Sequence, residues 1–80
     1  MADGGSHLVK RSVSLRGHRT SLALEPAFWA VLEQAAREEG CSLAGLIARI
    51  DEVRTGAGTG TGAPLSSAVR VWALARARRQ

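Results

Sequence analysis

The chain has 80 residues, of which 45% are apolar, and it carries a formal net charge of +4. This length allows one small domain, close to the size at which a chain has difficulty building a core alone, and the basic excess permits contact with nucleic acid or acidic surfaces. The single cysteine excludes an internal disulfide, and no apolar run approaches the roughly 20 residues that span a bilayer. The first ten residues lack the basic-then-apolar order of a signal peptide, so we expect a cytoplasmic protein without membrane contact.

The first ordered segment is predicted to be extended chain. After residues 1–8, which we expect to be a disordered N-terminus, the stretch RSVSLRGHRTSLALEP places small polar or charged residues at every second position up to Pro26. This alternation is typical of a strand with one buried and one exposed face. If Gly17 and His18 form a type II′ turn, two strands pair within the chain, Arg16 lies opposite Arg19, and polar and apolar side chains separate onto opposite faces. The sequence leaves open whether this hairpin forms or whether one strand pairs with a second subunit.

Two helices are predicted to follow the extended segment. Pro26 suits the first turn of a helix, where its missing N–H is not needed, and apolar residues then recur at helical spacing to about Glu39. Gly40 is a natural stop, because glycine tolerates the positive φ that often follows a last helical turn. Ser42 is a natural N-cap for a second helix, which we expect to end near Arg54.

The remainder of the chain is predicted to be a linker and a third helix. Residues 55–63, TGAGTGTGA, contain no large apolar side chain and closely spaced glycines, which is typical of a flexible Gly/Thr linker. Residues 64–80 then offer Ser66 or Ser67 as a cap and an apolar stripe of Val69, Trp72 and Ala73. Basic residues in the last turn suit the helix dipole, so we expect a C-terminal helix there.

No combination of residues predicts catalysis or metal binding. Cys41 lies beside a helix N-terminus that can lower a thiol pKa, but the sequence places no histidine or acid next to it. His7 and His18 lack metal-ligand spacing with Cys41. The glycine-rich run lacks the Lys-Ser or Lys-Thr of a phosphate-binding loop and the strand before it. We therefore expect neither an enzyme nor a bound metal or cofactor.

The order of these segments resembles a known family. A strand, a helix that opens directly after it, a Gly-x-Ser junction from Gly40 to Ser42 and a second amphipathic helix resemble the ribbon-helix-helix domain of small bacterial and phage regulators. The longer frame, from VKRSVSLRGHRTSLALEPAFW to LSSAVRVWAL, is similar to a bacterial branch of that superfamily with an extra C-terminal helix. The resemblance covers nearly the whole chain and assigns residues 9–54 to a ribbon-helix-helix core.

The resemblance implies a mostly helical fold with a short β-ribbon, intertwined as a homodimer, in which one strand from each subunit pairs antiparallel and lies in the DNA major groove. On this basis the outward strand residues Arg19, Ser21 and Ala23 contact base edges. Contacts with DNA phosphates are expected from basic residues near the ribbon and from the start of the second helix, namely Lys10, Arg11, Arg16, Ser42 and Leu43. The dimer core is expected from apolar residues that face the helices, namely Leu22, Leu24, Phe28, Leu32, Leu46, Ile47 and Ile50.

The sequence therefore predicts a DNA-binding transcriptional regulator whose partners are a second copy of the chain and double-stranded DNA. An alternative from a different class is a protein-interaction or antitoxin-like dimer, which presents the third helix, between Leu65 and Arg79, to a partner protein. A steep loss of DNA affinity with salt and with Arg19→Ala would favour the regulator. Absence of DNA binding, together with a partner that is lost when the third helix is removed, would favour the alternative.

Overall fold

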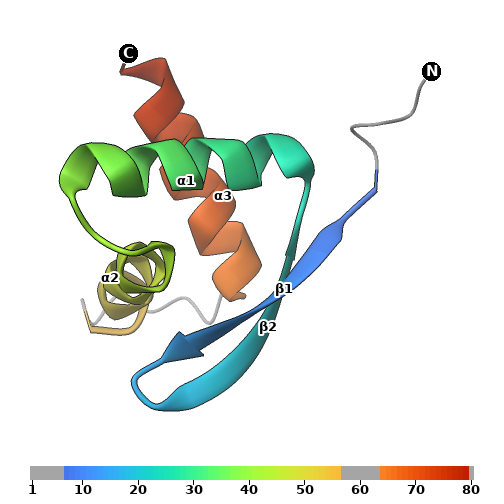
Figure 1. The fold of residues 1–80 in the computed structure, drawn as a ribbon, viewed down its shortest axis with the longest axis vertical. Coiled ribbons are helices and arrows are strands. Elements are labelled where there is room, and N and C mark those ends of the chain that lie inside the picture. The colour runs from blue at the N-terminus through green and yellow to red at the C-terminus, as the bar shows by residue number, and fades with distance from the viewer. Residues whose placement is uncertain (1–6, 57–63, 80) are drawn as a thin grey trace.

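Two strands and three helices form the part of the chain that the computed structural model describes, residues 7–56 and 64–79. Strands β1 (Val9–Leu15) and β2 (His18–Leu24) precede helices α1 (Pro26–Glu39), α2 (Leu43–Gly56) and α3 (Leu65–Arg78). The strands form one antiparallel hairpin beside the helices, and α3 crosses behind α1 (Figure 1). The predicted fold class, a short β-ribbon with a mostly helical body and a third C-terminal helix, is confirmed. Most of the predicted disordered N-terminus and of the predicted linker, residues 1–6 and 57–63, lies outside the described residues.

The hairpin forms within one chain, and its turn lies one residue earlier than the Gly17-His18 turn considered from the sequence. Leu15 pairs with His18, so Arg16 and Gly17 are the central residues of the turn, with φ of 54° and 83°. Two positive φ values define a type I′ turn, whereas the hairpin considered from the sequence had a type II′ turn at Gly17 and His18. Arg19 consequently faces Ser14 and not Arg16. Because the register differs by two residues, each side chain remains on its expected face of the ribbon.

Helices α1 and α2 begin and end close to the predicted residues. Pro26 occupies the first turn of α1, and Gly40 ends the helix in the left-handed conformation with φ of 70°. The Gly40 amide donates to carbonyls of the last turn of α1, so glycine satisfies acceptors that the helix itself leaves unpaired. Ser42 caps α2 as predicted, because its Oγ accepts the backbone N–H of Gly45 at 2.9 Å. Helix α2 runs to Gly56, two residues past its expected end at Arg54.

Helix α3 packs against its own chain. It contacts α1, α2 and β2, and its Val69 and Ala73 side chains are buried in the core. Arg70 reaches back to the start of α1, where its Nε donates to the Glu25 carboxylate at 3.0 Å. Neither Ser66 nor Ser67 caps the helix, since Pro64 is the N-cap residue and no side chain accepts from the first turn. The third helix is thus part of the folded unit.

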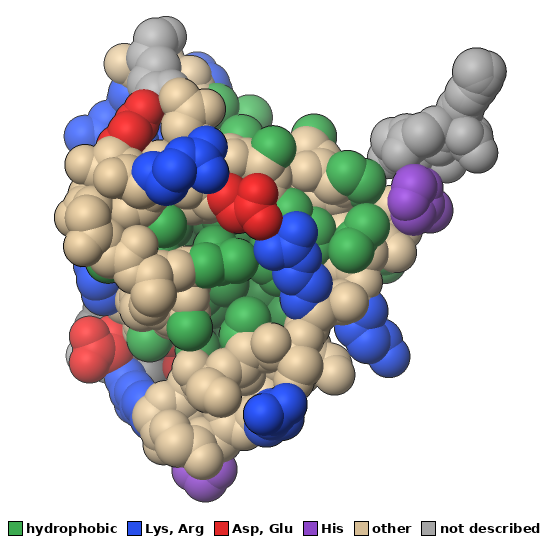
Figure 2. Space-filling model, viewed as in Figure 1, with side chains coloured by type: hydrophobic (Ala, Val, Ile, Leu, Met, Phe, Trp, Pro, Cys, Tyr) green, Lys and Arg blue, Asp and Glu red, His purple; other side chains and the backbone are tan. Residues whose placement is uncertain are grey.

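One hydrophobic core joins the inner face of the hairpin to all three helices. Hydrophobic side chains gather between α1, α2 and the hairpin on the face shown in Figure 2. Six of the seven residues expected in a dimer core are buried within this single chain, and Phe28 is partly buried. Strand β1, through Val13 and Leu15, and helix α3, through Val69 and Ala73, also contribute to this core. The six buried residues are Leu22, Leu24, Leu32, Leu46, Ile47 and Ile50.

Candidate nucleic-acid interface

The outer face of the hairpin is polar and carries no acidic residue. Alternate residues of both strands point away from the core, because successive side chains of a strand lie on opposite faces. The register places Lys10 opposite Ala23, Ser12 opposite Ser21, and Ser14 opposite Arg19. Ala23 is half-buried and the other five are exposed. We call these six residues the outer ribbon face.

The outer ribbon face also carries cations that have no carboxylate partner. Among the described residues, six arginines form ion pairs with acidic side chains, but neither Lys10 nor Arg19 does. The other basic side chains without such a partner are Arg37, Arg78 and Arg79, at the C-terminal ends of α1 and α3. An uncompensated cation on an exposed strand remains available for a phosphate or a base edge, since no internal pair must first be broken.

Arg16 extends the basic surface around the turn. Its side chain is about half exposed and lies 3.6 Å from the Glu52 carboxylate of α2. Such an exposed, long ion pair contributes little stability, and it competes weakly with another anion. Arg16 therefore lies beside the ribbon with one weakly bound partner, and its contact with a phosphate stays a prediction.

The inner face of β1 is fixed to α1 by a cluster of polar contacts around Trp29. The Trp29 indole N–H donates to the carbonyl of Val9 at 2.8 Å, and the guanidinium of Arg11 lies over the indole ring, 4.6 Å from its centre. Arg11 also donates to Glu33 at 2.7 Å. Arg11, an expected phosphate contact, is thus on the side of the ribbon opposite Lys10, and its guanidinium is paired. These contacts make β1 a docked strand and not a free arm.

The start of α2 is the other expected phosphate contact. Ser42 is exposed, and Leu43, the first residue of the helix, is partly buried. Because the Ser42 hydroxyl already accepts the Gly45 amide, the groups left for an anion are the first amides of α2 and the hydroxyl proton of Ser42. These hydrogen-bond donors lie at the N-terminus of α2, where the helix dipole favours a bound anion.

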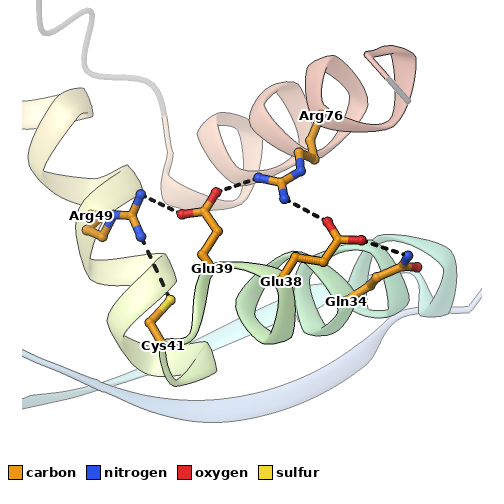
Figure 3. Close-up of polar contacts among 6 residues, drawn as sticks. All are labelled: Gln34, Glu38, Glu39, Cys41, Arg49 and Arg76. Atoms are coloured by element: carbon orange, nitrogen blue, oxygen red, sulfur yellow. Dashed lines mark hydrogen bonds and ion pairs between the residues drawn. The ribbon is translucent and has the colours of Figure 1, made fainter.

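A separate polar network holds the C-terminal end of α1 to the other two helices (Figure 3). Arg76 of α3 donates to both Glu38 and Glu39, and Arg49 of α2 pairs with Glu39 at 2.8 Å. The hydrogen bond from Arg76, followed by that from Arg49, lowers the pKa of the Glu39 carboxyl. Arg49 also lies 3.8 Å from the thiol sulfur of Cys41. These arginines stabilise the helix packing and are engaged by carboxylates.

The described part of the chain shows neither a metal site nor a membrane-spanning helix. No group of three or more histidine, cysteine or acidic side chains in residues 7–56 and 64–79 is arranged to hold a metal ion. Within the same residues, no helix is both long enough and apolar enough to cross a bilayer.

The described chain is thus a two-stranded ribbon, polar on its outer face and packed on its inner face against three helices. The chain belongs to the ribbon-helix-helix domain family, whose model matches residues 8–77. Proteins of this family typically dimerise, bind DNA and are not enzymes. The match includes α3, so the third helix belongs to the family domain and is not an appendage.

One solved structure is similar over nearly the whole chain. It is that of an uncharacterized protein from Bordetella pertussis Tohama I, with 35% sequence identity and a TM-score of 0.74. The similarity covers 92% of this chain and 58% of that protein, so the chain corresponds to little more than half the length of its structural relative. No curated protein matches the sequence.

Two residues of the outer ribbon face were absent from the expected contacts. Ser12 and Ser14 stand opposite Ser21 and Arg19, respectively, so β1 contributes as much polar surface as β2. The expected base contacts were taken from one strand per subunit, β2, so that only Lys10 and Arg11, as phosphate contacts, were expected from β1. The signal that identifies Ser12 and Ser14 is Gly17, since a glycine at the second central position is typical of a type I′ turn and fixes both strands in one chain.

Proposed function

We propose that this protein is a cytoplasmic DNA-binding regulator of transcription that inserts its hairpin into the major groove. The observation that supports this proposal is the outer ribbon face, which is exposed, free of acidic residues and provided with two uncompensated cations. A two-stranded antiparallel ribbon is one of the two elements that the major groove admits. Family membership supports the same function.

The width of the ribbon supports insertion by a single chain. If β2 formed the inner part of an intersubunit sheet while β1 remained paired to it, four strands would face the DNA, and such a sheet is too wide for the groove. Here β1 is docked to α1 through Trp29 and Arg11, and each chain already carries a complete two-stranded ribbon. We infer that the unit that enters the groove is the hairpin of one chain.

Within this proposal the residues of the outer ribbon face have different roles. Arg19 is the base reader, because its planar guanidinium can donate two hydrogen bonds to guanine O6 and N7. Ser21 donates to or accepts from a base edge, and Ala23 contacts a thymine methyl group. Ser12 and Ser14 add hydroxyl groups from the neighbouring strand.

The phosphate contacts surround this face. Lys10 and Arg16 are proposed to bind phosphates on the two sides of the groove, and the exposed start of α2 at Ser42 and Leu43 to bind a third through its amides. Arg11 would have to leave Glu33 to reach a phosphate, so we expect it to contribute least of the five.

Binding to duplex DNA, measured as a function of salt, tests the proposal. With genomic DNA fragments in a fluorescence anisotropy assay, we expect log K to fall with log salt with a slope of about −0.9 for each phosphate neutralised. Arg19→Ala should cost about 1–3 kcal/mol of binding free energy and relax the preference among sequences. Lys10→Ala should weaken binding to all sequences and reduce the slope by about one.

A matched control removes the same charge from another part of the molecule. Arg78 is exposed in the last turn of α3, which ends on the opposite side of the molecule from the hairpin turn (Figure 1). Arg78→Ala should therefore change affinity much less than Arg19→Ala. Equal losses in the two variants would show that binding is non-specific attraction to a basic protein, and affinity independent of salt would refute the proposed function.

The alternative function, binding of a partner protein through the third helix, receives less support. Val69 and Ala73, which form the buried stripe of α3, are covered by α1, α2 and β2 of the same chain. Removing residues after Ala63 would open the core, so a lost interaction in such a deletion would not identify a binding surface. A partner protein could contact only the outer side of α3. Substitutions on that side should weaken the binding of a partner protein without changing DNA binding, and they therefore distinguish the two functions.

A further inference from the structure

An apolar groove of about 620 Å³ runs between α2 and α3. The buried side chains of Leu46 and Ile50 lie at its base, and Val53 and Val71 stand on its two sides with exposed fractions of 71% and 69%. Apolar side chains that gather in a groove mark a surface at which another molecule binds, because binding removes them from water. The folded chain therefore has an apolar surface between these two helices that its own described residues do not cover.

The open shape of the groove favours a helix as its occupant over a small molecule. A site for a small molecule encloses most of the surface of its ligand. Here the valines on both sides remain largely exposed, so the groove does not enclose a ligand in that way. Two packed helices instead present a furrow that accepts the side-chain ridge of a third helix. Amphipathic helices bind such furrows through apolar residues that recur at helical spacing.

Two arginines continue the groove side of α3 beyond the groove itself. Ala75 lines the groove, and Arg78 and Arg79 follow it by three and four residues, so they lie on the same side of the helix one turn further on. Both side chains are exposed, and neither forms an ion pair with a carboxylate of the described residues. This side of α3 therefore consists of an apolar stretch followed by two uncompensated positive charges.

The arginines within the groove differ, because carboxylates of the same chain already neutralise them. Arg49 pairs with Glu39 at 2.8 Å, and Arg54 pairs with Asp51 at 2.6 Å. Negative charge on a bound partner is therefore attracted to the end of the groove and not to its middle. An apolar occupant that carries acidic residues matches this distribution of charge.

We propose that the α2–α3 groove binds an acidic amphipathic helix of a partner protein. The apolar side of that helix packs between Val53 and Val71, and its carboxylates pair with Arg78 and Arg79. The groove shares no residue with the outer ribbon face. This binding therefore does not depend on the proposed DNA contact, and either proposal can fail without the other.

Two designed helical peptides test the proposal on the full chain. Both carry leucines at i, i+3, i+4 and i+7, and their polar sides consist of glutamates in one peptide and of lysines in the other. In fluorescence anisotropy at low salt we expect the acidic peptide to bind at least about fivefold more tightly, with a difference that shrinks as salt screens the charges. The double substitution Arg78→Glu, Arg79→Glu should reverse this preference.

A matched control separates the groove from the net charge of the protein. The double substitution Lys10→Glu, Arg19→Glu makes the same change of charge at two exposed positions of the outer ribbon face. It should retain the preference for the acidic peptide. Loss of the preference in this control, to the same extent as in Arg78→Glu, Arg79→Glu, would show general attraction to a basic protein and would overturn the proposal.

Substitution of Val71 tests the apolar part of the groove. Val71→Asp should raise the dissociation constant of the acidic peptide by at least about tenfold, because the bound peptide would cover an unpaired carboxylate. Leu8→Asp, which places the same charge on an exposed apolar residue outside the groove, should leave that constant unchanged. Far-UV circular dichroism should show that both variants remain folded, since both side chains are exposed in the wild type.

Three results would show that the groove has another role. Equal affinities for the two peptides would overturn the proposal, and so would a folded Val71→Asp variant that binds the acidic peptide as tightly as the wild type. Analytical ultracentrifugation without peptide supplies the third test. A Val71→Asp variant with the same oligomeric state as the wild type supports the proposal, whereas conversion of an oligomer to a monomer would show that a second copy covers the groove and would overturn it.

Discussion

Side chains of β1 should contribute to the stability of the core as those of the helices do. The loss in free energy of unfolding on substitution of Leu15 measures this contribution. Leu15 is 6% exposed on the inner face of the hairpin, so Leu15→Ala removes its isopropyl group from a packed position. Loss of a buried leucine side chain in this way costs about 2–5 kcal/mol, from the lost transfer free energy and the cavity that remains. A chain of 80 residues has a free energy of unfolding of roughly 4–12 kcal/mol, so the substitution removes a large share.

Urea unfolding, monitored by far-UV circular dichroism, gives the free energy of unfolding of each variant for comparison with the wild type. The control is Leu8→Ala, which makes the same change one residue before β1 begins, where the side chain is 51% exposed. We expect that control to change the free energy of unfolding by less than about 0.5 kcal/mol. If Leu15→Ala were as mild as Leu8→Ala, β1 would be a loosely attached arm, and the argument that the hairpin is a rigid ribbon of one chain would be refuted.

Three further predictions concern the turn, a helix cap and the polar network. Gly17→Ala should lower the free energy of unfolding by about 1 kcal/mol, because φ is 83° at this position. The cost comes from the backbone alone, since the added methyl group meets no neighbouring atom. An unchanged urea midpoint would contradict the type I′ turn. Ser42→Ala should cost about 1 kcal/mol through the lost cap, whereas Ser67→Ala, in a helix with no side-chain cap, should cost less than about 0.5 kcal/mol in the same assay. Arg76 lowers the pKa of Glu39 in the folded chain, so the resulting stability is present above the ordinary glutamate pKa of about 4.3 and is lost as pH falls below it. The melting temperature of Glu39→Gln should therefore decline less steeply with acid than that of the wild type, and parallel pH profiles would contradict this role.

The local structure around the helix junction could be predicted from the sequence. Pro26, Gly40 and Ser42 each have a conformational or hydrogen-bonding preference that acts within a few residues. The bounds of α1 and the cap of α2 follow from these preferences, and the structure confirms both. The two faces of the ribbon were likewise predictable, because they depend only on the alternation of polar and apolar residues.

The position of the hairpin turn could not be fixed in the same way. Gly17 can be the first central residue of a type II′ turn or the second of a type I′ turn, and these differ by two residues in register. Both registers keep the same side chains on the inner face, so the polar pattern cannot choose between them. In the folded chain, the observed register accompanies a hydrogen bond from the indole N–H of Trp29 to the carbonyl of Val9.

The sequence pattern could not predict which elements α3 packs against. Its contacts with α1 join residues that are far apart along the chain, such as Arg70 with Glu25 and Arg76 with Glu39. Helical periodicity indicates that α3 has an apolar side, but it does not tell which chain covers that side. Residues such as Leu32 and Ile47 were assigned to a dimer core from the family resemblance, and each is fully buried within this chain.

Mapping the DNA contact on the folded protein tests the central claim most directly. Amide resonances of the protein, followed by NMR during titration with duplex DNA, report which residues change environment. The account predicts that the largest shifts occur on the hairpin, at Lys10, Ser12, Arg19 and Ser21, with smaller shifts at the start of α2. Shifts confined to the basic end of α3, or no shifts at all, would contradict the proposal that the outer ribbon face binds DNA.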